Sequence, residues 1–222
     1  MNVLLVLAHP ERHSFNGAMF DTARSTLERA GHTVVTSDLY RMGFDPVSSR
    51  RNFKTIKDGD YLKLQTEEMW ASEVNGFAPD VDAEIAKIEA ADLMIWQFPM
   101  WWFGLPAVLK GWVDRTFVMG RVYGYGHIYE TGRFKGKRAL LSLTTGGPEG
   151  AYVKDGFNGD IQAMLRPMQR GMLEFTGFSV LQAQVVYAPV RADDAQRQAW
   201  LAQWAQRLEA IETEAAVEVG RY

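Results

Sequence analysis

Cysteine is missing from this chain of 222 residues, and neither sign of charge is in strong excess. Without cysteine there is no disulfide framework, no thiolate nucleophile and no metal centre with cysteine ligands. The 24 Lys and Arg residues nearly balance the 27 Asp and Glu residues, for a formal net charge of −3. Such a balance leaves no excess of basic residues for binding DNA or RNA. The nearest approach to a long apolar run, residues 91–109, contains Asp92, Gln97 and two prolines, which suits a membrane span poorly. We therefore expect a cytoplasmic protein that does not insert into membranes.

The two best-known phosphate-binding sequences are absent as well. No Gly-x-Gly-x-x-Gly follows the first apolar run and no Walker A sequence occurs, which disfavours a classical NAD-binding Rossmann domain and a P-loop ATPase. His9 and His13 are four residues apart, but Pro10 would break a helix between them and no carboxylate–histidine cluster accompanies them. We expect no metal site, and we expect any phosphorylated ligand to be held by a loop without the glycine pattern.

The segments that are present alternate between apolar runs and helical periodicity. The alternation predicts an α/β fold: a doubly wound, five-stranded and mostly parallel sheet between two helical layers. A single domain covers residues 1–215 and a C-terminal tail covers residues 216–222. The expected strands are 2–8, 32–39, 92–98, 137–144 and 178–187, and the expected helices are 14–30, 79–90, 105–116, 159–175 and 192–215, with a further possible helix at 59–72.

Three of the predicted loops carry chemistry, and each follows the carboxyl end of a strand. Ligands of open α/β sheets bind at that edge, so we expect the loops 9–16, 98–104 and 144–152 to converge. The first has imidazole and hydroxyl donors beside a helix N-terminus, the second has consecutive aromatics, and the third has a glycine-rich turn with free amides. Core packing of the aromatics and an ordinary turn at 144–147 are the simpler alternatives. Together the loops suit a phosphorylated, planar, aromatic ligand.

The same loops resemble those of a known family. HPERHSFN at 9–16, FPMWWFGLPAVLKGW at 98–112 and LTTGG at 143–147 are similar to the NAD(P)H:quinone oxidoreductases, the DT-diaphorase-like branch of the flavodoxin-like fold. The resemblance runs from about residue 2 to about residue 208. It implies a two-electron reductase that passes hydride from NAD(P)H, or a related dihydronicotinamide, through bound FAD to quinones in ping-pong order.

The resemblance also implies roles for particular residues. Residues that match the family's FAD site are His9, Ser14, Phe15, Asn16, Pro99, Met100, Trp102, Phe103, Thr144, Thr145, Gly146, Gly147, Tyr152 and Arg197. Residues that match its substrate cavity are Trp102, Tyr123, Tyr125, Asn158 and Phe175. Tyr123 and Tyr125 match tyrosines that reach into the neighbouring subunit's pocket, so a homodimer is expected.

One departure from the family pattern concerns proton delivery. Tyr152 and Asn158 occupy the catalytic positions, and Asn158 stands where the best-known members have a histidine. Because asparagine has no titratable proton, a tyrosine–histidine relay is in doubt, and the choice among NADH, NADPH and another dihydronicotinamide stays open. Two rival functions also stay open: a flavodoxin-like regulatory subunit of a membrane transporter, and an azo- or nitro-reductase that uses FMN in place of FAD.

Overall fold

A parallel sheet forms the centre of the molecule. The computed structural model describes residues 1–220. Its strands lie in the order β2-β1-β3-β4-β5, with β6 also paired to β4, and every pair is parallel. Their bounds are β1 (Asn2–Leu7), β2 (Thr33–Asp38), β3 (Leu93–Pro99), β4 (Arg138–Thr145), β5 (Ser179–Val180) and β6 (Gln184–Tyr187). The runs predicted as central strands are buried on both faces, as parallel strands require. The expected flavodoxin-like α/β fold is confirmed.

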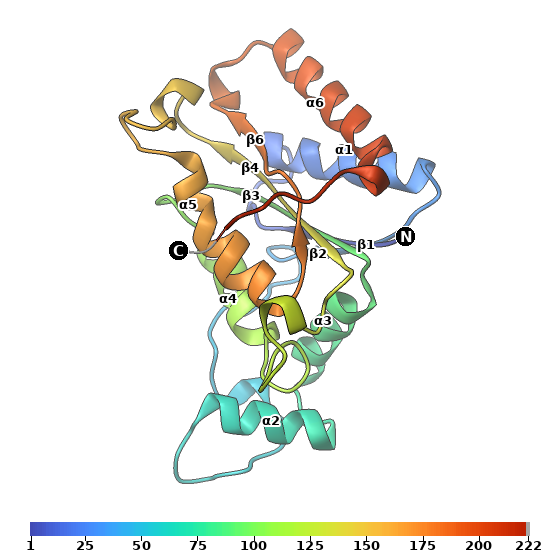
Figure 1. Ribbon diagram of the computed structural model, residues 1–222, viewed down its shortest axis with the longest axis vertical. Coiled ribbons are helices and arrows are strands. Elements are labelled where there is room, and N and C mark those ends of the chain that lie inside the picture. Colours follow the sequence, from blue (N-terminus) through green and yellow to red (C-terminus); the bar gives the residue numbers. More distant parts are fainter. Residues whose placement is uncertain (221–222) are drawn as a thin grey trace.

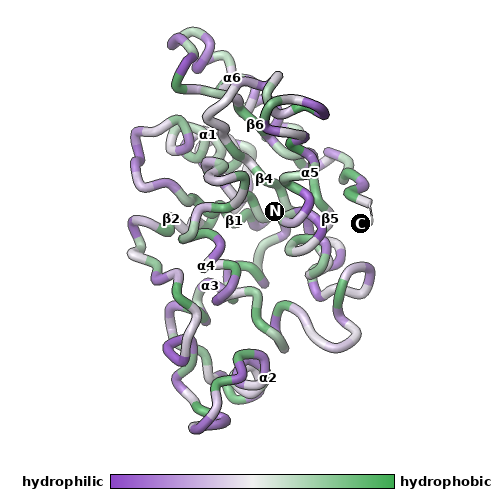
Figure 2. The backbone as a smooth tube through the Cα atoms, turned by 90° about the vertical axis from the view of Figure 1, so that its left-hand side faces the viewer, coloured by the Kyte–Doolittle hydropathy of each residue, from purple (hydrophilic) through white to green (hydrophobic). Residues whose placement is uncertain are grey.

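Two helical layers cover the sheet (Figure 1). On one face, α1 (Phe15–Arg29) and α6 (Asp194–Glu209) pack on a core that includes Leu5 and Leu140. On the other face, α3 (Pro79–Ala90), α4 (Ala107–Thr116) and α5 (Ile161–Met168) pack on a core that includes Trp96 and Leu141. Neighbouring residues of one strand thus serve opposite cores, because side chains alternate across a sheet. Figure 2 shows the hydrophobic segments gathered mainly where the strands lie.

The helix α2 (Leu64–Val74) stands away from the sheet, at the lower end of Figure 1. Two adjacent buried glutamates tie it to the rest of the chain. The Glu67 carboxylate accepts from the backbone N–H groups of Lys57 (2.7 Å) and Asp58 (2.8 Å), and Glu68 Oε2 accepts from the N–H of Met119 (2.8 Å). Burial raises the pKa of Glu68, and the Met119 N–H opposes that shift. We call α2 together with residues 53–63 the α2 lobe.

Several boundaries differ from the sequence-based expectation. The possible helix at 59–72 is α2, which begins at Leu64 and ends at Val74. The last expected strand, 178–187, is two short strands, because residues 181–183 leave the ladder between β5 and β6. Both pair with β4, so they share one edge position and the sheet keeps the expected order. The helix expected at 159–175 continues past Met168 only as a π-turn and a 3-10 turn. Pro167, which has no N–H to donate, lies in its last turn. The final helix ends at Glu209, short of 215.

The segment expected to be a tail packs on the domain as far as the structure describes it. The N–H of Val217 donates to the carbonyl of Val180 (2.8 Å), and Arg166 donates to the carbonyls of Val219 (2.8 Å) and Gly220 (3.0 Å). Val217 and Val219 also contact the core. Residues 221–222 lie outside the described residues.

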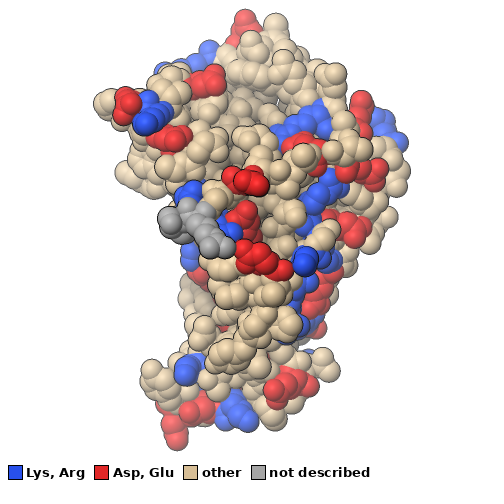
Figure 3. All heavy atoms as spheres, viewed as in Figure 1, with Lys and Arg blue, Asp and Glu red and all other residues tan. Residues whose placement is uncertain are grey.

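The surface agrees with the near-zero net charge. Figure 3 shows acidic and basic side chains interspersed on the face it presents, without an area of one sign. Within residues 1–220 no helix combines the length and the apolarity that crossing a bilayer requires.

Candidate active site

A cavity of about 510 Å³ opens where the carboxyl ends of β1, β3, β4 and β6 meet. Four segments that are far apart in the chain contribute to it, as expected for the switch point of a doubly wound sheet. It is lined by His9, Ser14, Phe15, Asn16, Pro99, Met100, Trp101, Thr144, Thr145, Gly146, Pro189, Val190 and Arg197. These include most of the residues expected to bind the cofactor; the exceptions are Trp102, Phe103, Gly147 and Tyr152.

The first loop ends in the N-terminus of α1. Ser14 caps this helix by accepting the N–H of Gly17 at 3.2 Å, so the hydroxyl hydrogen of Ser14 is available to a ligand. The backbone N–H groups of Phe15 and Asn16 are in the first helical turn, where a helix supplies no acceptor of its own. Together with the helix dipole they form a site suited to an anion.

His9 contributes one ring nitrogen to this loop. Its Nδ1 lies 2.9 Å from the carbonyl oxygen of Glu11 and 3.0 Å from the backbone N of the same residue, so Nδ1 is engaged by the loop backbone. Nε2 is therefore the ring nitrogen of His9 that is left for a ligand of the cavity.

The second loop contains a strained turn. Trp101 and Gly104 exchange backbone hydrogen bonds of 3.2 and 3.0 Å, and between them Trp102 and Phe103 have φ of 50° and 59°. Bulky residues seldom adopt this left-handed conformation, which costs roughly 1–3 kcal/mol for each residue. The turn places the Trp101 ring in the cavity, 6.3 Å from the ring of His9, and leaves the side chain of Trp102 97% exposed. Of the three consecutive aromatic residues, only Trp101 thus lines the cavity.

The third loop holds the cavity floor through neutral polar side chains. Asn16 Nδ2 donates to Thr144 Oγ1 (2.9 Å), and Thr145 Oγ1 donates to the carbonyl of Gly147 (2.8 Å). The N–H of Met100 donates to the carbonyl of Thr144 (2.8 Å), which joins the second loop to the third. Asn16, Thr144 and Thr145 are all buried. The floor is therefore a tightly bonded set of donors and acceptors that carries no net charge.

The expected catalytic pair lies beside this floor. A Cβ built on Gly147 would lie 3.1 Å from Tyr152 Cε2 and 3.4 Å from Asn158 Nδ2, so all three residues meet, and a side chain at Gly147 would shift the Tyr152 ring by a few tenths of an ångström. Tyr152 is buried, and its ring lies 5.9 Å from that of Tyr187. Burial, assisted by the charges of nearby carboxylates, raises the pKa of Tyr187. Tyr187 thus remains a neutral phenol beside Tyr152.

Arg197 lines the cavity, but its guanidinium is already engaged. Nη1 donates to the carbonyls of Pro189 (3.2 Å) and Ala192 (2.5 Å), and Nη2 contacts Asp194 Oδ1 at 2.5 Å. These bonds hold the loop that follows β6 against the start of α6. In this structure Arg197 shapes one wall of the cavity through that loop.

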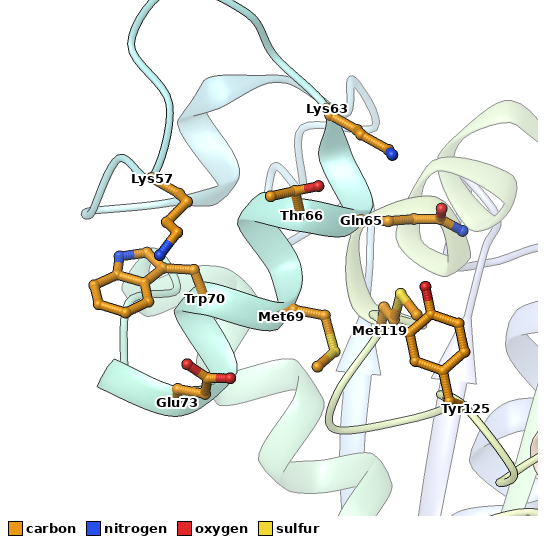
Figure 4. A pocket seen from close by; sticks show the side chains of 9 residues that line it. All are labelled: Lys57, Lys63, Gln65, Thr66, Met69, Trp70, Glu73, Met119 and Tyr125. Atoms are coloured by element: carbon orange, nitrogen blue, oxygen red, sulfur yellow. The ribbon is translucent and has the colours of Figure 1, made fainter.

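The remaining substrate candidates gather elsewhere in the subunit. The ring of Tyr123 lies 5.6 Å from that of Phe175, and its hydroxyl accepts from Gln65 Nε2 at 3.3 Å. Burial raises the pKa of Tyr123. Tyr125 is 87% exposed and borders a second cavity, of about 240 Å³, between Met119 and the α2 lobe (Figure 4). None of the three expected residues lines the main cavity of its own chain.

Comparisons with known proteins agree with this geometry. A family model described as the flavodoxin-like fold matches residues 1–208. The chain is 44% identical over 209 residues to NAD(P)H dehydrogenase [quinone] 1 of Cavia porcellus, covering 94% of this chain and 76% of that protein. It is 41% identical over 210 residues to ribosyldihydronicotinamide dehydrogenase [quinone] of Pongo abelii, covering 94% and 91%. The chain belongs to the NAD(P)H:quinone oxidoreductase family. A Klebsiella pneumoniae structure assigned as a quinone reductase superposes with a TM-score of 0.91 at 35% identity, covering 98% of this chain and 87% of that one.

In this member of the NAD(P)H:quinone oxidoreductase family, sequence reasoning missed several residues of the site. Trp101 was noted only as part of an aromatic run, and nothing local marks Pro189, Val190 or Tyr187 as neighbours of the cavity. Their signal is positional: Pro189 and Val190 directly follow the last strand, and residues at that edge are candidates in any doubly wound fold. Reading the loop after the fifth expected strand would have found them.

Proposed function

We propose that the chain is an NAD(P)H dehydrogenase (quinone), a two-electron reductase in which bound FAD passes hydride from NAD(P)H, or a related dihydronicotinamide, to quinones in ping-pong order. Family membership supports the enzyme class. The observation that carries the rest is the cavity itself, which joins an anion-binding helix N-terminus, an apolar wall and a row of neutral donors in one site. Such a site accepts a flavin nucleotide.

The donor set fits the parts of a flavin one by one. The N-terminal amides of α1 and the Nε2 side of the His9 ring suit the phosphate groups. Pro99, Met100 and Trp101 form the apolar wall against which a planar ring packs. The third loop supplies the Thr144 hydroxyl and backbone amides for the polar edge of that ring.

When bound, the flavin supplies the hydride chemistry, and the protein supplies binding and electrostatics. The donors of the third loop would stabilise negative charge at the ring edge. Tyr152 adds a buried phenolic donor beside Gly147. Asn158 can hold that phenol or a substrate by hydrogen bonds but cannot exchange a proton with it. The donor and the quinone use the same cavity in turn, so changes in its wall should affect both half-reactions.

A homodimer completes the proposal. Trp102, Tyr125 and Phe157 are among the most exposed side chains of the subunit, at 97%, 87% and 97%. Aromatic side chains are enriched at protein–protein interfaces. We propose that a second copy of the chain does so, with Tyr123 and Tyr125 reaching the partner's cavity.

The test begins with the purified protein. We expect a yellow protein that releases FAD on heating, identified by chromatography against FMN standards. Under anaerobic conditions NADH, NADPH or a small dihydronicotinamide should bleach the flavin, and a quinone should restore its colour in a separate step. A colourless protein that takes up no flavin would refute the proposal. Released FMN with azo or nitro reduction, or bound flavin without turnover, would favour the two rival functions.

A further inference from the structure

A glutamine lies beneath the candidate site, in a part of the sheet that is otherwise apolar. Gln97 is 1% exposed and pairs in register with Leu7 on β1 and Ser142 on β4. Residues two and four positions earlier on the same strand face belong to the hydrophobic core under α1 and α6. Burying a primary amide there costs free energy unless the amide forms hydrogen bonds.

Gln97 begins a directed chain of hydrogen bonds that ends at the cavity. Its Nε2 donates to Asn16 Oδ1 at 2.8 Å, and Asn16 Nδ2 donates to Thr144 Oγ1 at 2.9 Å. Both Asn16 and Thr144 are buried, and both line the cavity. Three side chains from β3, α1 and β4 thus form one continuous path.

The direction of these hydrogen bonds decides whether the Thr144 hydroxyl acts as a donor or as an acceptor toward a ligand. Because Thr144 Oγ1 accepts from Asn16, its own hydrogen is left for an acceptor in the cavity. If the Asn16 amide were turned over, its oxygen would accept that hydrogen instead, and Thr144 would present only lone pairs. The N–H of Gln97 prevents this reversal of the Asn16 amide, because it needs an acceptor and Asn16 Oδ1 is the oxygen that faces it.

The orientation of Gln97 is itself constrained. Its Nε2 also lies 3.7 Å from Met19 Sδ, a weak acceptor. Its carbonyl oxygen Oε1 has no hydrogen-bond partner among the described residues, and the same holds for Ser142 Oγ on the neighbouring strand. Turning Gln97 over alone would place that oxygen against Asn16 Oδ1. Turning both amides over together would place it against the sulfur of Met19, with which Nε2 now makes its weak bond.

We propose that Gln97 is a positioning residue that fixes Thr144 as a hydrogen-bond donor to the ligand of the cavity. The identity of that ligand, a flavin, rests on the proposed function. A donor at this place favours a ligand with a partly negative polar edge, and it favours the reduced flavin over the oxidised one, since reduction adds negative charge.

The test uses two nearly isosteric substitutions and their combination. Gln97→Met removes the first donor while keeping the unbranched shape, and Thr144→Val removes the last one. We expect each to raise the flavin dissociation constant about tenfold, the scale of one lost hydrogen bond, and to lower the flavin midpoint potential. The double variant should match Thr144→Val alone, because Gln97 acts through Thr144. Additive effects, or an unchanged Gln97→Met protein, would overturn the proposal.

A matched control and a flavin-independent measurement separate this idea from the proposed function. Ser142→Ala removes a buried hydroxyl beside Gln97 that has no hydrogen bond among the described residues. It should leave the flavin dissociation constant and the midpoint potential unchanged. In flavin-free protein, hydrogen exchange of the Asn16 side-chain amide should be at least tenfold faster in Gln97→Met than in wild type or Ser142→Ala. Equal exchange rates would overturn the chain of bonds whether or not flavin binds. A wild type that binds no flavin would refute the proposed function instead.

Discussion

The candidate site and the α2 lobe are held in place by different means. The site is built on the ends of β1, β3 and β4, which are buried on both faces, and the hydrogen bonds of its floor join neutral amides and hydroxyls. The α2 lobe lies apart from the sheet and is tied down by two buried carboxylates, Glu67 and Glu68. The sheet gives the site a rigid base that does not depend on pH. The lobe depends on ionisable groups, so its stability should respond to pH and to the loss of single acceptors.

The largest effect should come from the site. Tyr152→Phe removes a buried phenolic donor beside Gly147 and should slow flavin reduction by roughly 10²–10³-fold, the scale of one such donor. Stopped-flow reduction by NADH, NADPH and a small dihydronicotinamide measures it. Tyr61→Phe, which changes an exposed phenol of the α2 lobe, is the matched control. Wild-type rates for Tyr152→Phe with every donor would make Tyr152 a wall of the pocket only.

In the α2 lobe the largest effect should follow loss of an acceptor at Glu67. Its two oxygens each accept one backbone N–H, from Lys57 and Asp58. Glu67→Gln keeps the shape but leaves an NH₂ group facing one of those N–H groups. We expect the free energy of unfolding to fall by about 1–3 kcal/mol, measured by urea denaturation, with faster proteolysis near residues 57–61. Unchanged stability would mean that this loop is held by something else.

The cost of backbone strain also differs between the two regions: it is high at a bulky residue of the site and low at a residue of the α2 lobe. Trp102 in the site has φ of 50°, and Asn75, which caps α2, has φ of 53°. Trp102→Gly relieves the strain of a bulky residue and should raise the free energy of unfolding of the subunit by about 1 kcal/mol while activity falls. Asn75→Gly should change stability by only a few tenths, since asparagine tolerates this conformation. Denaturation at several protein concentrations distinguishes strain from dimer contacts, and equal changes in both variants would contradict the interpretation.

The smallest effect should be at Glu68, and its sign should be opposite to that at Glu67. Burial raises the folded-state pKa of Glu68 above its unfolded value, so its contribution favours folding at low pH and is lost as the pH rises through the folded pKa. Glu68→Gln keeps an acceptor for the Met119 N–H without the charge. The variant should therefore be slightly more stable than wild type at pH 7, by less than about 1 kcal/mol, and the gain should disappear near pH 4. A stability loss at pH 7 would contradict this sign.

Much of the fold was predictable because its signals are local. Apolar runs such as 2–8 and 92–98 mark strands buried on both faces, and Ser14 marks the start of α1 by its capping chemistry. The split of the last strand was not predictable, because residues 181–183 alternate between apolar and polar like a strand and only their packing removes them from the ladder. Helix α5 is short because Pro167 lies in its last turn. The proline is plain in the sequence, but the helical periodicity continues past it and predicts a longer helix.

The order of strands and helices, and the three loops that meet at the carboxyl edge, follow from the sequence alone, because burial periodicity and turn chemistry act over a few residues. Which side chains meet in those loops was decided only by the tertiary structure. The bond between Asn16 and Thr144 joins residues 128 apart, and the bond between Gln97 and Asn16 joins residues 81 apart. No local pattern encodes such pairs, since each depends on how two loops are brought together by strands that both lie elsewhere in the chain. The same holds for the choice of Trp101 over Trp102 as the cavity wall, which the backbone of a single strained turn decides.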